Sequence, residues 1–458
     1  MCNTARQDCS QPAASSIAFA SLRFFTCLLL VQGLIACGGS NAPPASPRTR
    51  VILIAIDGAT WDIILPMMEA GRLPNFKRLV HEGATGNMLT ITEPHEYQSA
   101  ALWTTAATGK HPSQHGILAN TTAGNHLPTS NMRRVRALWN ILSDYERRVG
   151  MVGYFVTWPV ENVNGFMVSD RAWGEGLKQI DTPPGLLDRL GADPFWVWDP
   201  TGEATVRELR RFIGFDFNID NAKKSKDTPE TWRNYLVFER LNWVYPRDES
   251  FARIGLRLLE QERPDFFAIY FHGIDWVSHG FWVYHQPDWK GYHPDVVAMV
   301  REDDVKHMGN IIRRYYVYQD ELLGRFLDAA DSQTLVLVAS DHGFGPGRVE
   351  GNHWYLTGTH RVEGILAAWG HGARPGIRIG DATLFDIAPT ILHLLDLPVA
   401  SDMPGRVLLE MFDSSVSEKI DRVVTHETVM DPDVSRSPIL SPVDEQMLGR
   451  LKKIGYVD

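Results

Sequence analysis

The sequence predicts an α/β fold in which a mostly parallel central sheet carries helices on both faces. Three apolar runs have the length and composition of buried strands, namely Val51–Ile56, Asp265–Phe271 and Thr334–Ala339. Apolar runs without polar alternation are typical of strands that are covered on both sides. Segments with helical periodicity lie between these runs, and the alternation of strands and helices favours a parallel sheet.

Length and composition are those of an ordinary globular protein. The 458 residues suffice for one large α/β domain or two smaller ones, and 44% of them are apolar. The net charge of −10 is spread along the chain, so no nucleic-acid binding is expected. An acidic protein that acts on anionic substrates needs metal ions or a local cationic site.

The N-terminal region has the features of a targeting segment. All four cysteines lie at or before Cys37, so the later residues contain no disulfide. The apolar run from Phe24 to Ile35 is short for a membrane span and fits the hydrophobic part of a signal peptide. It leads into Leu34-Ile35-Ala36-Cys37, which resembles the lipobox of bacterial lipoproteins.

We therefore expect residues 1–36 to be a lipoprotein signal peptide and Cys37 to carry the lipid. Residues 37–50 are rich in Gly, Ser, Ala and Pro and are expected to form a flexible tether. The protein would then be anchored in the membrane of the bacterial cell envelope, at the outer membrane or facing the periplasm. The alternative is an N-terminal anchor that is not cleaved.

Helices and one more strand are expected after the first strand. Leu65–Val80 has helical character, with prolines that mark starts or breaks. Residues 99–108 suit a buried helix that Gly109 ends. Ala137–Arg147 is amphipathic, and Val149–Tyr154 follows it closely as a strand.

The stretch from Arg171 to about Gln261 departs from this rhythm. It is rich in Trp, Asp, Arg and Pro and suggests helices at Thr201–Phe212 and Glu230–Arg240 without strands between them. We interpret residues 171–261 as an insertion over the carboxyl edge of the sheet and as a candidate lid. The alternative is a side domain that only adds stability. Its tryptophans could line a cleft, although core packing is the simpler expectation.

The regular pattern returns in the second half of the chain. The expected elements are a loop through His285 and His293, a long helix Val305–Ala330, a strand Gly364–Trp369 and a helix Asp386–Leu395 capped by Asp386. The main domain is thus expected to span residues 51–412. A polar tail of residues 413–458 follows and ends in a short helix, Asp444–Lys453.

Carboxylates and histidines follow the predicted strands, where a parallel sheet binds its ligands. The six residues are Asp57, Asp275, His279, Asp341, His342 and His360. Zn²⁺ accepts carboxylate oxygen and imidazole nitrogen together, and six ligands exceed what one zinc ion takes. The pattern therefore predicts two divalent metal ions, with Zn²⁺ favoured and Mn²⁺ or iron as alternatives. The opposing interpretation is that these residues are helix caps and ion-pair partners.

The same residues resemble the ligand pattern of the alkaline phosphatase superfamily, and in particular its type I phosphodiesterase/nucleotide pyrophosphatase branch. The motifs are Asp57, Asp275-x-x-x-His279, Asp341-His342-Gly343 and His360. The segment Thr108-Gly109-Lys110-His111-Pro112-Ser113-Gln114-His115-Gly116-Ile117 looks like the stretch that follows the nucleophile of that branch. The similarity runs from about Val51 to Val407 and implies a three-layer sandwich of the alkaline phosphatase type with an inserted lid region.

The resemblance assigns a role to each residue. One metal would be held by Asp57, Asp341 and His342 and would also contact Ser99, and the other by Asp275, His279 and His360. Ser99 falls at the position of the nucleophile, where metal contact favours the alkoxide and a helix N-terminus favours an anionic phosphoryl group. Asn120 falls where the branch has an asparagine that holds a phosphoryl oxygen. Without the resemblance, Ser99 could be a helix cap and Asn120 a turn residue.

Two departures bear on the substrate. Nucleotide pyrophosphatases carry threonine followed by Phe-Pro-Asn, whereas this chain has Ser99 followed by Ala100-Ala101-Leu102. Sulfatases need a Cys/Ser-x-Pro-x-Arg context that is also missing here. The sequence thus predicts a two-metal hydrolase of phosphate esters, in particular phosphodiesters, of small-molecule, lipid or nucleotide type. The alternatives are a phosphomonoesterase, a phospho-group transferase, a sulfatase as the least favoured enzyme, or a non-catalytic binding protein of the envelope.

Overall fold

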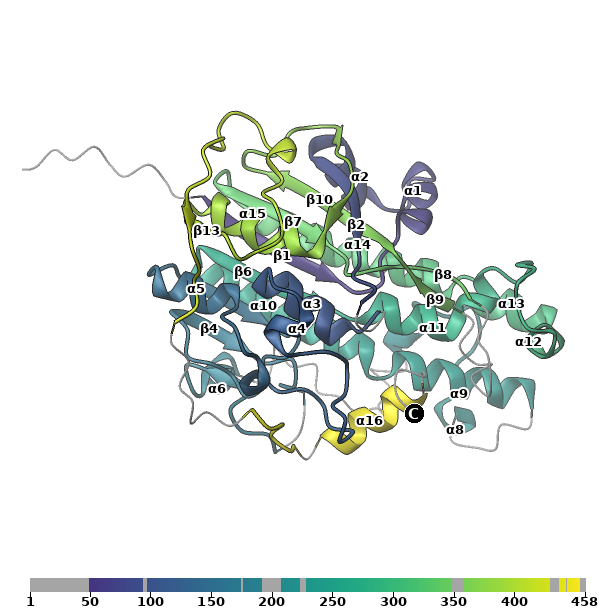
Figure 1. Cartoon of the computed structure of the whole chain (residues 1–458). Helices are drawn as coiled ribbons and strands as arrows, with labels where there is room; N and C mark the ends of the chain where they lie inside the picture. Colours follow the sequence, from purple (N-terminus) through teal and green to yellow (C-terminus); the bar gives the residue numbers. More distant parts are fainter. Residues whose placement is uncertain are drawn as a thin grey trace, which may run out of the picture. The chain divides into compact units, whose positions relative to one another are not determined.

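A ten-stranded sheet forms the centre of the computed structural model (Figure 1). The structure describes residues 49–93, 97–173, 176–191, 207–222, 228–347, 358–428, 436–441 and 443–453. The predicted signal peptide, Cys37 and nearly all of the predicted tether lie outside these residues. Within the described parts of the chain, no helix has the length and apolar character needed to cross a membrane.

The strand order of the sheet is β11-β2-β10-β7-β1-β6-β3-β4-β5, and β12 pairs with β2. Its strands are β1 Arg50–Ile56, β2 Ala84–Leu89, β3 Val149–Val152, β4 Gly165–Val168, β5 Asp181–Thr182, β6 Phe266–Phe271, β7 Thr334–Ala339, β10 Glu363–Gly370, β11 Ile377–Arg378 and β12 Ala382–Thr383. The pairs around β1, β3 and β6 are parallel, whereas β10 is antiparallel to both of its neighbours and β5 to β4. The predicted α/β class with a mostly parallel sheet is confirmed.

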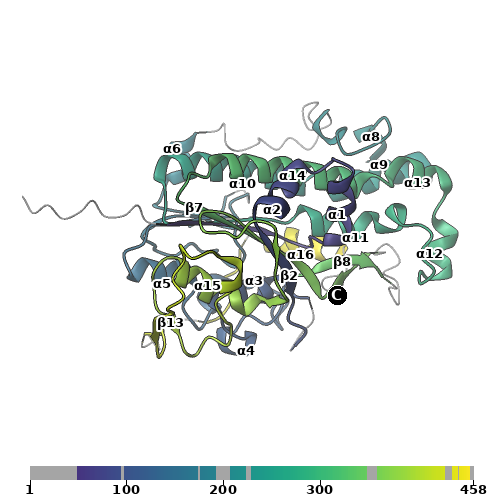
Figure 2. The same cartoon turned by 90° about the horizontal axis from the view of Figure 1, so that it is seen from above.

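Helices cover both faces of the sheet. They are α1 Trp61–Glu69, α2 Pro74–Glu82, α3 Ser99–Thr108, α4 Pro112–His115, α5 Leu138–Asp144, α6 Leu186–Leu190, α8 Ile219–Ala222, α9 Pro229–Leu241, α10 Val244–Glu262, α11 Gly273–His285, α12 Pro294–Met299, α13 Glu302–Met308, α14 Ile311–Ala329, α15 Ile387–Leu394 and α16 Asp444–Lys453. Figure 2 shows α2, α10 and α14 on one side of the sheet and α3, α5 and α15 on the other. Short helices connect several of these elements.

The alternation of side chains along β1 explains the two layers. Ile52, Ile54 and Ile56 belong to one buried cluster, together with apolar residues of α1, α2, α10 and α14. Val51 and Leu53 belong to a second cluster that includes residues of α3, α5 and α15. Because successive side chains of a strand point to opposite faces, a continuous apolar run is what a strand between two helical layers requires.

Two predicted long helices are each divided in the structure. The predicted helix Leu65–Val80 is replaced by two helices. α1 ends at Glu69, a short turn follows, and α2 begins at Pro74. The predicted helix Val305–Ala330 is replaced by α13 and α14, with Gly309 at the C-terminal end of α13. Pro74, which the sequence marks as a start or break, begins α2, whereas the break at Gly309 was not predicted.

Other expectations need correction. The loop predicted through His285 is the helix α11, which continues from β6 almost without interruption. The strand β2 was not predicted, since its sequence Ala-Thr-Gly-Asn-Met-Leu has no apolar run. Asp386 lies at the start of α15, but its carboxylate accepts N–H groups of Thr383 and Arg406 and makes no cap bond to the helix.

The stretch 171–261 is not separate from the core throughout. Helix α10 contacts β3 and β6, so the last part of this stretch belongs to a helical layer of the sheet. Helix α9 contacts α11 instead. Most of the predicted helix Thr201–Phe212 lies outside the described residues. A role of the remaining stretch as a lid stays a prediction.

Two small ladders complete the described structure. Strands β8 Gly343–Pro346 and β9 Gly358–Arg361 pair antiparallel, and β13 Val399–Ala400 pairs parallel with β14 Arg422–Val423. The β8–β9 ladder begins directly after Asp341 and His342, and β9 contains His360. It therefore connects two groups of the predicted ligands.

Candidate active site

The register of the sheet places three predicted ligand groups at the same edge. β1 pairs with β6 and β7, so Ile56 lies beside Phe271 and Ala55 beside Ala339. Asp57 directly follows β1, and Asp341 follows β7 by two residues. Asp275 lies in the first turn of α11, just beyond β6. All three carboxylates are fully buried.

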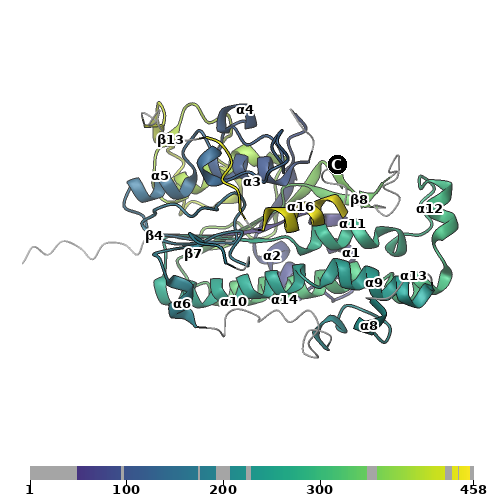
Figure 3. The ribbon, with the colours of Figure 1, turned by 90° about the horizontal axis from the view of Figure 1, so that it is seen from below.

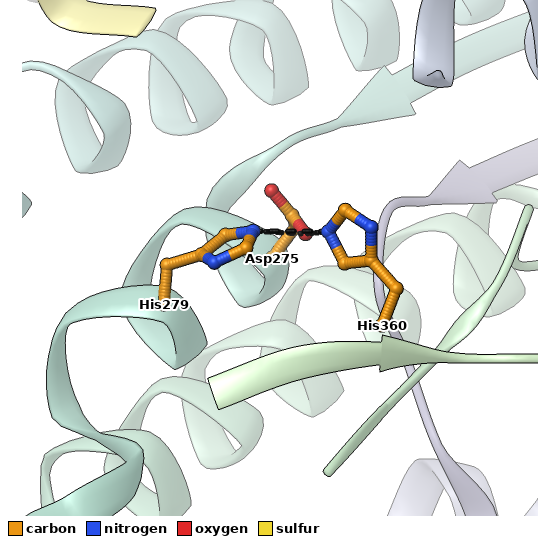
Figure 4. A group of neighbouring side chains, drawn as sticks. All are labelled: Asp275, His279 and His360. Carbon is orange, nitrogen blue, oxygen red and sulfur yellow. Dashed lines mark hydrogen bonds and ion pairs between the residues drawn. The ribbon is translucent and has the colours of Figure 1, made fainter. Parts of the chain in front are cut away.

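One cluster joins α11 to the β8–β9 ladder (Figure 4). Asp275 and His279 are four residues apart on α11 and so lie on the same face of the helix. The Nε2 atom of His360 lies 2.9 Å from Nε2 of His279 and 3.2 Å from Oδ1 of Asp275. Ligand atoms of the three residues are all within 4.8 Å of one another, as one metal ion would require.

A second cluster lies at the end of β1. The Nε2 atom of His342 is 3.2 Å from Oδ1 of Asp57, 3.6 Å from Oδ2 of Asp341 and 3.9 Å from Oδ1 of Asp275. Asp275 thus contributes to both clusters. Gly58 permits this close approach, because its φ is +69° and a Cβ atom there would lie 2.9 Å from Cα of Asp275.

The hydrogen bonds at the second cluster leave buried polar atoms unsatisfied. Among the described residues, the Oδ1 atom of Asp57, both carboxylate oxygens of Asp341, Nε2 of His342 and the Oγ atom of Ser99 have no hydrogen-bond partner. Buried polar atoms without partners are costly and rare in native proteins. The combination of these oxygens with imidazole nitrogen fits divalent metal ions such as Zn²⁺.

The charges of the site support the same conclusion. Burial and the nearby carboxylate of Asp57 raise the pKa of Asp341 well above its usual range. Burial lowers the pKa of His342, but the carboxylates of Asp341 and Asp57 outweigh this effect and raise that pKa to about 10. Three carboxylates this close together need positive charge beside them. In the absence of metal, protons held by Asp341 and His342 supply this charge, and bound metal ions would replace those protons.

Ser99 is the first residue of α3 and lines a pocket together with Asn120 and His272. It is 1% exposed. Gln98, and not Ser99, occupies the cap position of α3, and no side-chain cap bond is made there. The alternative role of Ser99 as a simple helix cap is therefore not supported. Its hydroxyl is left without a hydrogen bond to the described residues, so its oxygen is available to a ligand.

Asn120 lies beside the start of α3. Its Oδ1 atom accepts the backbone N–H of Ala100 at 2.9 Å. The backbone N–H of Asn120 donates to Oε1 of Gln98 at 3.0 Å. This orientation leaves the side-chain NH₂ group as a donor. The N–H groups of Ala100 and Ala101 are already bonded, the latter to the carbonyl of Gln98. Helix α3 therefore offers mainly its dipole to an anion, and Asn120 offers the donor.

Two residues of the site were not predicted. The hydroxyl of Tyr270 donates to Oδ2 of Asp57 and also bonds Nδ1 of His272. The carboxylate only accepts, so the hydroxyl proton goes to Asp57 and His272 donates from Nδ1. Two weak signals for this pair are present in the sequence. Tyr270 is a polar aromatic residue near the end of the strand β6, and His272 lies three residues before Asp275.

The remaining histidines agree in part with the sequence analysis. His115, expected to be structural, is buried and bonds the hydroxyl of Thr105 at 3.0 Å. His353 lies outside the described residues. His285 is half-buried in α11 and is not a loop residue.

A pocket opens at Ser99. Asn120, Phe155 and His272 line it, together with Trp173 and Trp243 of the stretch 171–261. The two tryptophans therefore belong to a cleft as well as to the packing of the protein.

The chain is similar to one protein family and to several known proteins. The family model described as type I phosphodiesterase/nucleotide pyrophosphatase matches residues 51–390. The 2,3-bisphosphoglycerate-independent phosphoglycerate mutases of Gloeothece citriformis and Synechocystis sp. are each 36% identical over 126 residues. The matched part is 25% of this chain and only 24% of each mutase.

The fold also resembles a solved structure. A mutant of the alkaline phosphatase PafA is 12% identical and superimposes with a TM-score of 0.50. The match covers 81% of this chain and 100% of that protein. At this identity the similarity concerns the fold alone, which is that of the alkaline phosphatases.

Proposed function

The chain belongs to the type I phosphodiesterase/nucleotide pyrophosphatase family, and we propose that it is a two-metal phosphodiesterase that acts through Ser99. One observation carries the proposal. The buried Ser99 hydroxyl has no hydrogen-bond partner among the described residues, and two carboxylate–histidine clusters that share Asp275 lie at the same sheet edge. A serine that only caps a helix or packs in the core would use its hydroxyl in a hydrogen bond and would not require metal clusters at the same sheet edge.

Each residue has a defined task in the proposed reaction. Divalent ions held by the two clusters would supply Lewis-acid activation of the phosphoryl group and of the serine hydroxyl. The Oγ atom of Ser99 attacks phosphorus, and the bond to the leaving oxygen breaks on the opposite side. Water then cleaves the phosphate ester of Ser99 and restores the hydroxyl. Asn120 donates its NH₂ group to a phosphoryl oxygen throughout.

The substitution Ser99→Ala tests the nucleophile. We expect it to reduce turnover of a diester such as bis(4-nitrophenyl) phosphate to the background rate, because alanine lacks the attacking oxygen. Metal content, measured by elemental analysis, should stay close to that of the unchanged protein. Ser113→Ala is the matched control, since Ser113 is exposed in α4 and its hydroxyl bonds His111. Full activity of Ser99→Ala would exclude Ser99 as the nucleophile.

A phospho-group transferase is the second candidate, because the matched curated relatives are mutases. The two activities differ in what accepts the phosphoryl group from Ser99. Hydrolysis in the presence of glycerol or another alcohol, followed by ³¹P NMR, separates free phosphate ester products from transfer products. A phosphomonoesterase would favour 4-nitrophenyl phosphate over the diester in the same assay. A sulfatase would hydrolyse 4-nitrophenyl sulfate, and a binding protein would hydrolyse none of these substrates.

We also propose that the protein is a lipoprotein of the bacterial cell envelope, with Cys37 as the lipidated residue. The support is the Leu34-Ile35-Ala36-Cys37 motif after an apolar run. Cells that express the full chain should incorporate labelled palmitate into the protein and retain it in the membrane fraction. Cys37→Ala should abolish the labelling. Labelling that persists in Cys37→Ala would rule out this site.

A further inference from the structure

The pocket beside Ser99 has one wall that comes from the C-terminal tail. The pocket borders Ser99 and Asn120, and most of its lining is apolar. Val443, directly before α16, and Met447, within α16, both line it. In the view from below, α16 lies in front of the region between α3 and α11 (Figure 3). Both residues lie beyond position 390, where the family match ends.

Buried polar contacts hold this wall in place. Arg171 donates to Asp444 at 2.8 Å, and the side chains are only 5% and 9% exposed. The same guanidinium donates to the carbonyl of Pro128 at 2.9 Å. An ion pair of this kind is costly to break on one side only, so it ties the start of α16 firmly to the main domain.

The segment before α16 is tied to the same loop. The backbone N–H of Ile439 donates to Oγ1 of Thr129 at 3.2 Å, and the side chain of Asn131 donates to the carbonyl of Ser437 at 2.8 Å. Pro128, next to Thr129, also lines the pocket. Hydrogen bonds therefore join the C-terminal wall to residues 128–131, which include another part of the pocket lining.

The pocket lies on the side of the nucleophile. Its lining includes Ser99 and Asn120, but none of Asp275, His279 and His360. In an in-line displacement the leaving group departs from the side opposite the nucleophile. The group in this pocket is therefore the one that stays on phosphorus. A monoester has no such group, so the pocket favours a diester.

The chemistry of the lining selects an apolar group. Leu127, Phe155, Trp173, Trp243, Val443 and Met447 contribute apolar surface. Two of the charged residues are already engaged within the protein, Arg171 as described and Asp170 with the backbone N–H of Val156 at 3.1 Å. Arg247 is engaged as well, because its guanidinium lies 3.4 Å from Oδ1 of Asp248 and over the ring of Phe251.

We propose that Val443 and Met447 are specificity-determining residues, which restrict the substrate to a phosphodiester whose retained group is uncharged and apolar, such as an aryl or alkyl group. The proposal rests on the proposed function, because it takes Ser99 as the nucleophile. It assigns to the tail a part of the site that the family match does not cover.

Two substrates with the same leaving group test the proposal. Bis(4-nitrophenyl) phosphate and methyl 4-nitrophenyl phosphate both release nitrophenolate and differ only in the retained group. The unchanged enzyme should prefer the aryl group. Met447→Glu places a charge in the apolar wall and should reduce the ratio of the two kcat/KM values by roughly tenfold or more. General repulsion of the anionic substrates cancels in this ratio.

Two further variants complete the design. Met447→Leu keeps an apolar wall and should leave the ratio unchanged, whereas Met447→Ala should lower it less than the glutamate variant does. Met447 is half-buried, and thermal unfolding of each variant checks that the fold is retained. An unchanged ratio in a folded Met447→Glu protein overturns the proposal.

A binding measurement separates this proposal from the proposed function. In Ser99→Ala protein, calorimetry compares the affinities for bis(4-nitrophenyl) phosphate and dimethyl phosphate. A preference for the aryl diester that Met447→Glu removes supports the apolar pocket, even if the unchanged protein hydrolyses neither substrate. Turnover without any such preference supports the proposed function and contradicts the apolar pocket.

Discussion

The two oxygens of the Asp57 carboxylate have different surroundings. Oδ2 accepts the hydroxyl of Tyr270, whereas Oδ1 has no hydrogen bond from the described residues and lies 3.2 Å from Nε2 of His342. Burial and the charge of Asp275 raise the pKa of Asp57, but the nearby imidazoles of His272 and His342 outweigh them and hold that pKa below its usual range. The carboxylate is thus charged and orientated before a metal ion binds.

Tyr270→Phe tests whether this orientation matters. Loss of a group that holds a metal ligand typically costs about 10- to 100-fold in metal affinity or activity. We expect the metal concentration that gives half-maximal activity to rise by about this factor, while activity at saturating metal changes less. Titration of the metal-free protein with Zn²⁺ measures both quantities.

Tyr318→Phe is the matched control for this change. Its hydroxyl is also buried and also donates to a carboxylate, that of Glu249 at 3.1 Å. A metal titration curve that is the same for Tyr270→Phe and Tyr318→Phe would show that Tyr270 has no specific role at the site.

At the scale of elements, α11 determines the geometry of one metal cluster. Its start is held by Asp248 of α10, which accepts the backbone N–H groups of His272 and Gly273 at 3.2 and 2.9 Å. Asp275 and His279 then follow on one face of the helix, and β9 brings His360 to the same point. Three separate elements therefore have to pack correctly before this ligand set exists.

The packing of α4 on α3 depends on a neutral histidine. Nδ1 of His115 accepts the backbone N–H of Ile117 at 3.2 Å, so its Nε2 donates to Thr105 of α3. A second proton on the ring would oppose the first of these bonds. Burial, followed by the charge of Arg133, lowers the pKa of His115 from 6.5 to about 3.

This shift predicts a loss of stability in acid. Above pH 6.5 the histidine is neutral in both the folded and the unfolded state, and its contribution is fully present. Between pH 6.5 and about 3 only the unfolded state binds the proton, so the folded state loses stability as pH falls. At pH 5 the loss is about 2 kcal/mol, at about 1.4 kcal/mol per pH unit.

His115→Asn removes this titration. The variant should be less stable than the unchanged protein at pH 7 because of its lost contacts, but its free energy of unfolding should fall less between pH 7 and 5. Denaturant unfolding of both proteins at the two pH values measures the difference. Equal decreases would show that His115 does not titrate as described. Because both proteins contain the same metal site, effects of metal release largely cancel.

At the scale of the whole molecule, the sheet concentrates negative charge at one edge. Asp57, Asp275 and Asp341 are fully buried and come from segments that are far apart in sequence. Folding brings these carboxylates together at a cost that metal ions would offset. Metal that binds only the folded state stabilises it by about 4 kcal/mol when its free concentration is a thousandfold above Kd.

Metal removal should therefore destabilise the fold. We expect a lower midpoint of thermal unfolding after treatment with a chelator and dialysis, and recovery when Zn²⁺ is restored. Asp341→Asn should change stability in opposite directions with and without metal. In the metal-free protein the variant should be more stable than the unchanged protein, and in the metal-bound protein it should be less stable. The physical reason is that the substitution removes both a repulsive charge and a ligand. Identical unfolding curves with and without chelator would contradict a metal site.

Much of the fold was predictable because local patterns determine it. The apolar runs at Val51–Ile56 and Thr334–Ala339 are strands with those boundaries or one residue more, and residues 99–108 form α3. The prolines indicated the break at Pro74, but the patterns did not reveal β2, which pairs with β10, or the break at Gly309. Pairing between distant segments leaves no periodic signal in either of them.

The sequence by itself determined the class of the fold, the resemblance to the family and six candidate ligands. The structure groups five of these as Asp275, His279 and His360 and as Asp57, Asp275 and His342, with Asp341 beside His342. Their residue types and their places after strands follow from local composition and from motifs. Only the tertiary structure decided that Asp275 belongs to both clusters, that Tyr270 and His272 support Asp57, and that the C-terminal tail lines the pocket at Ser99. These features depend on contacts between segments that are distant in the chain, and such contacts arise only when the helical layers pack against the sheet.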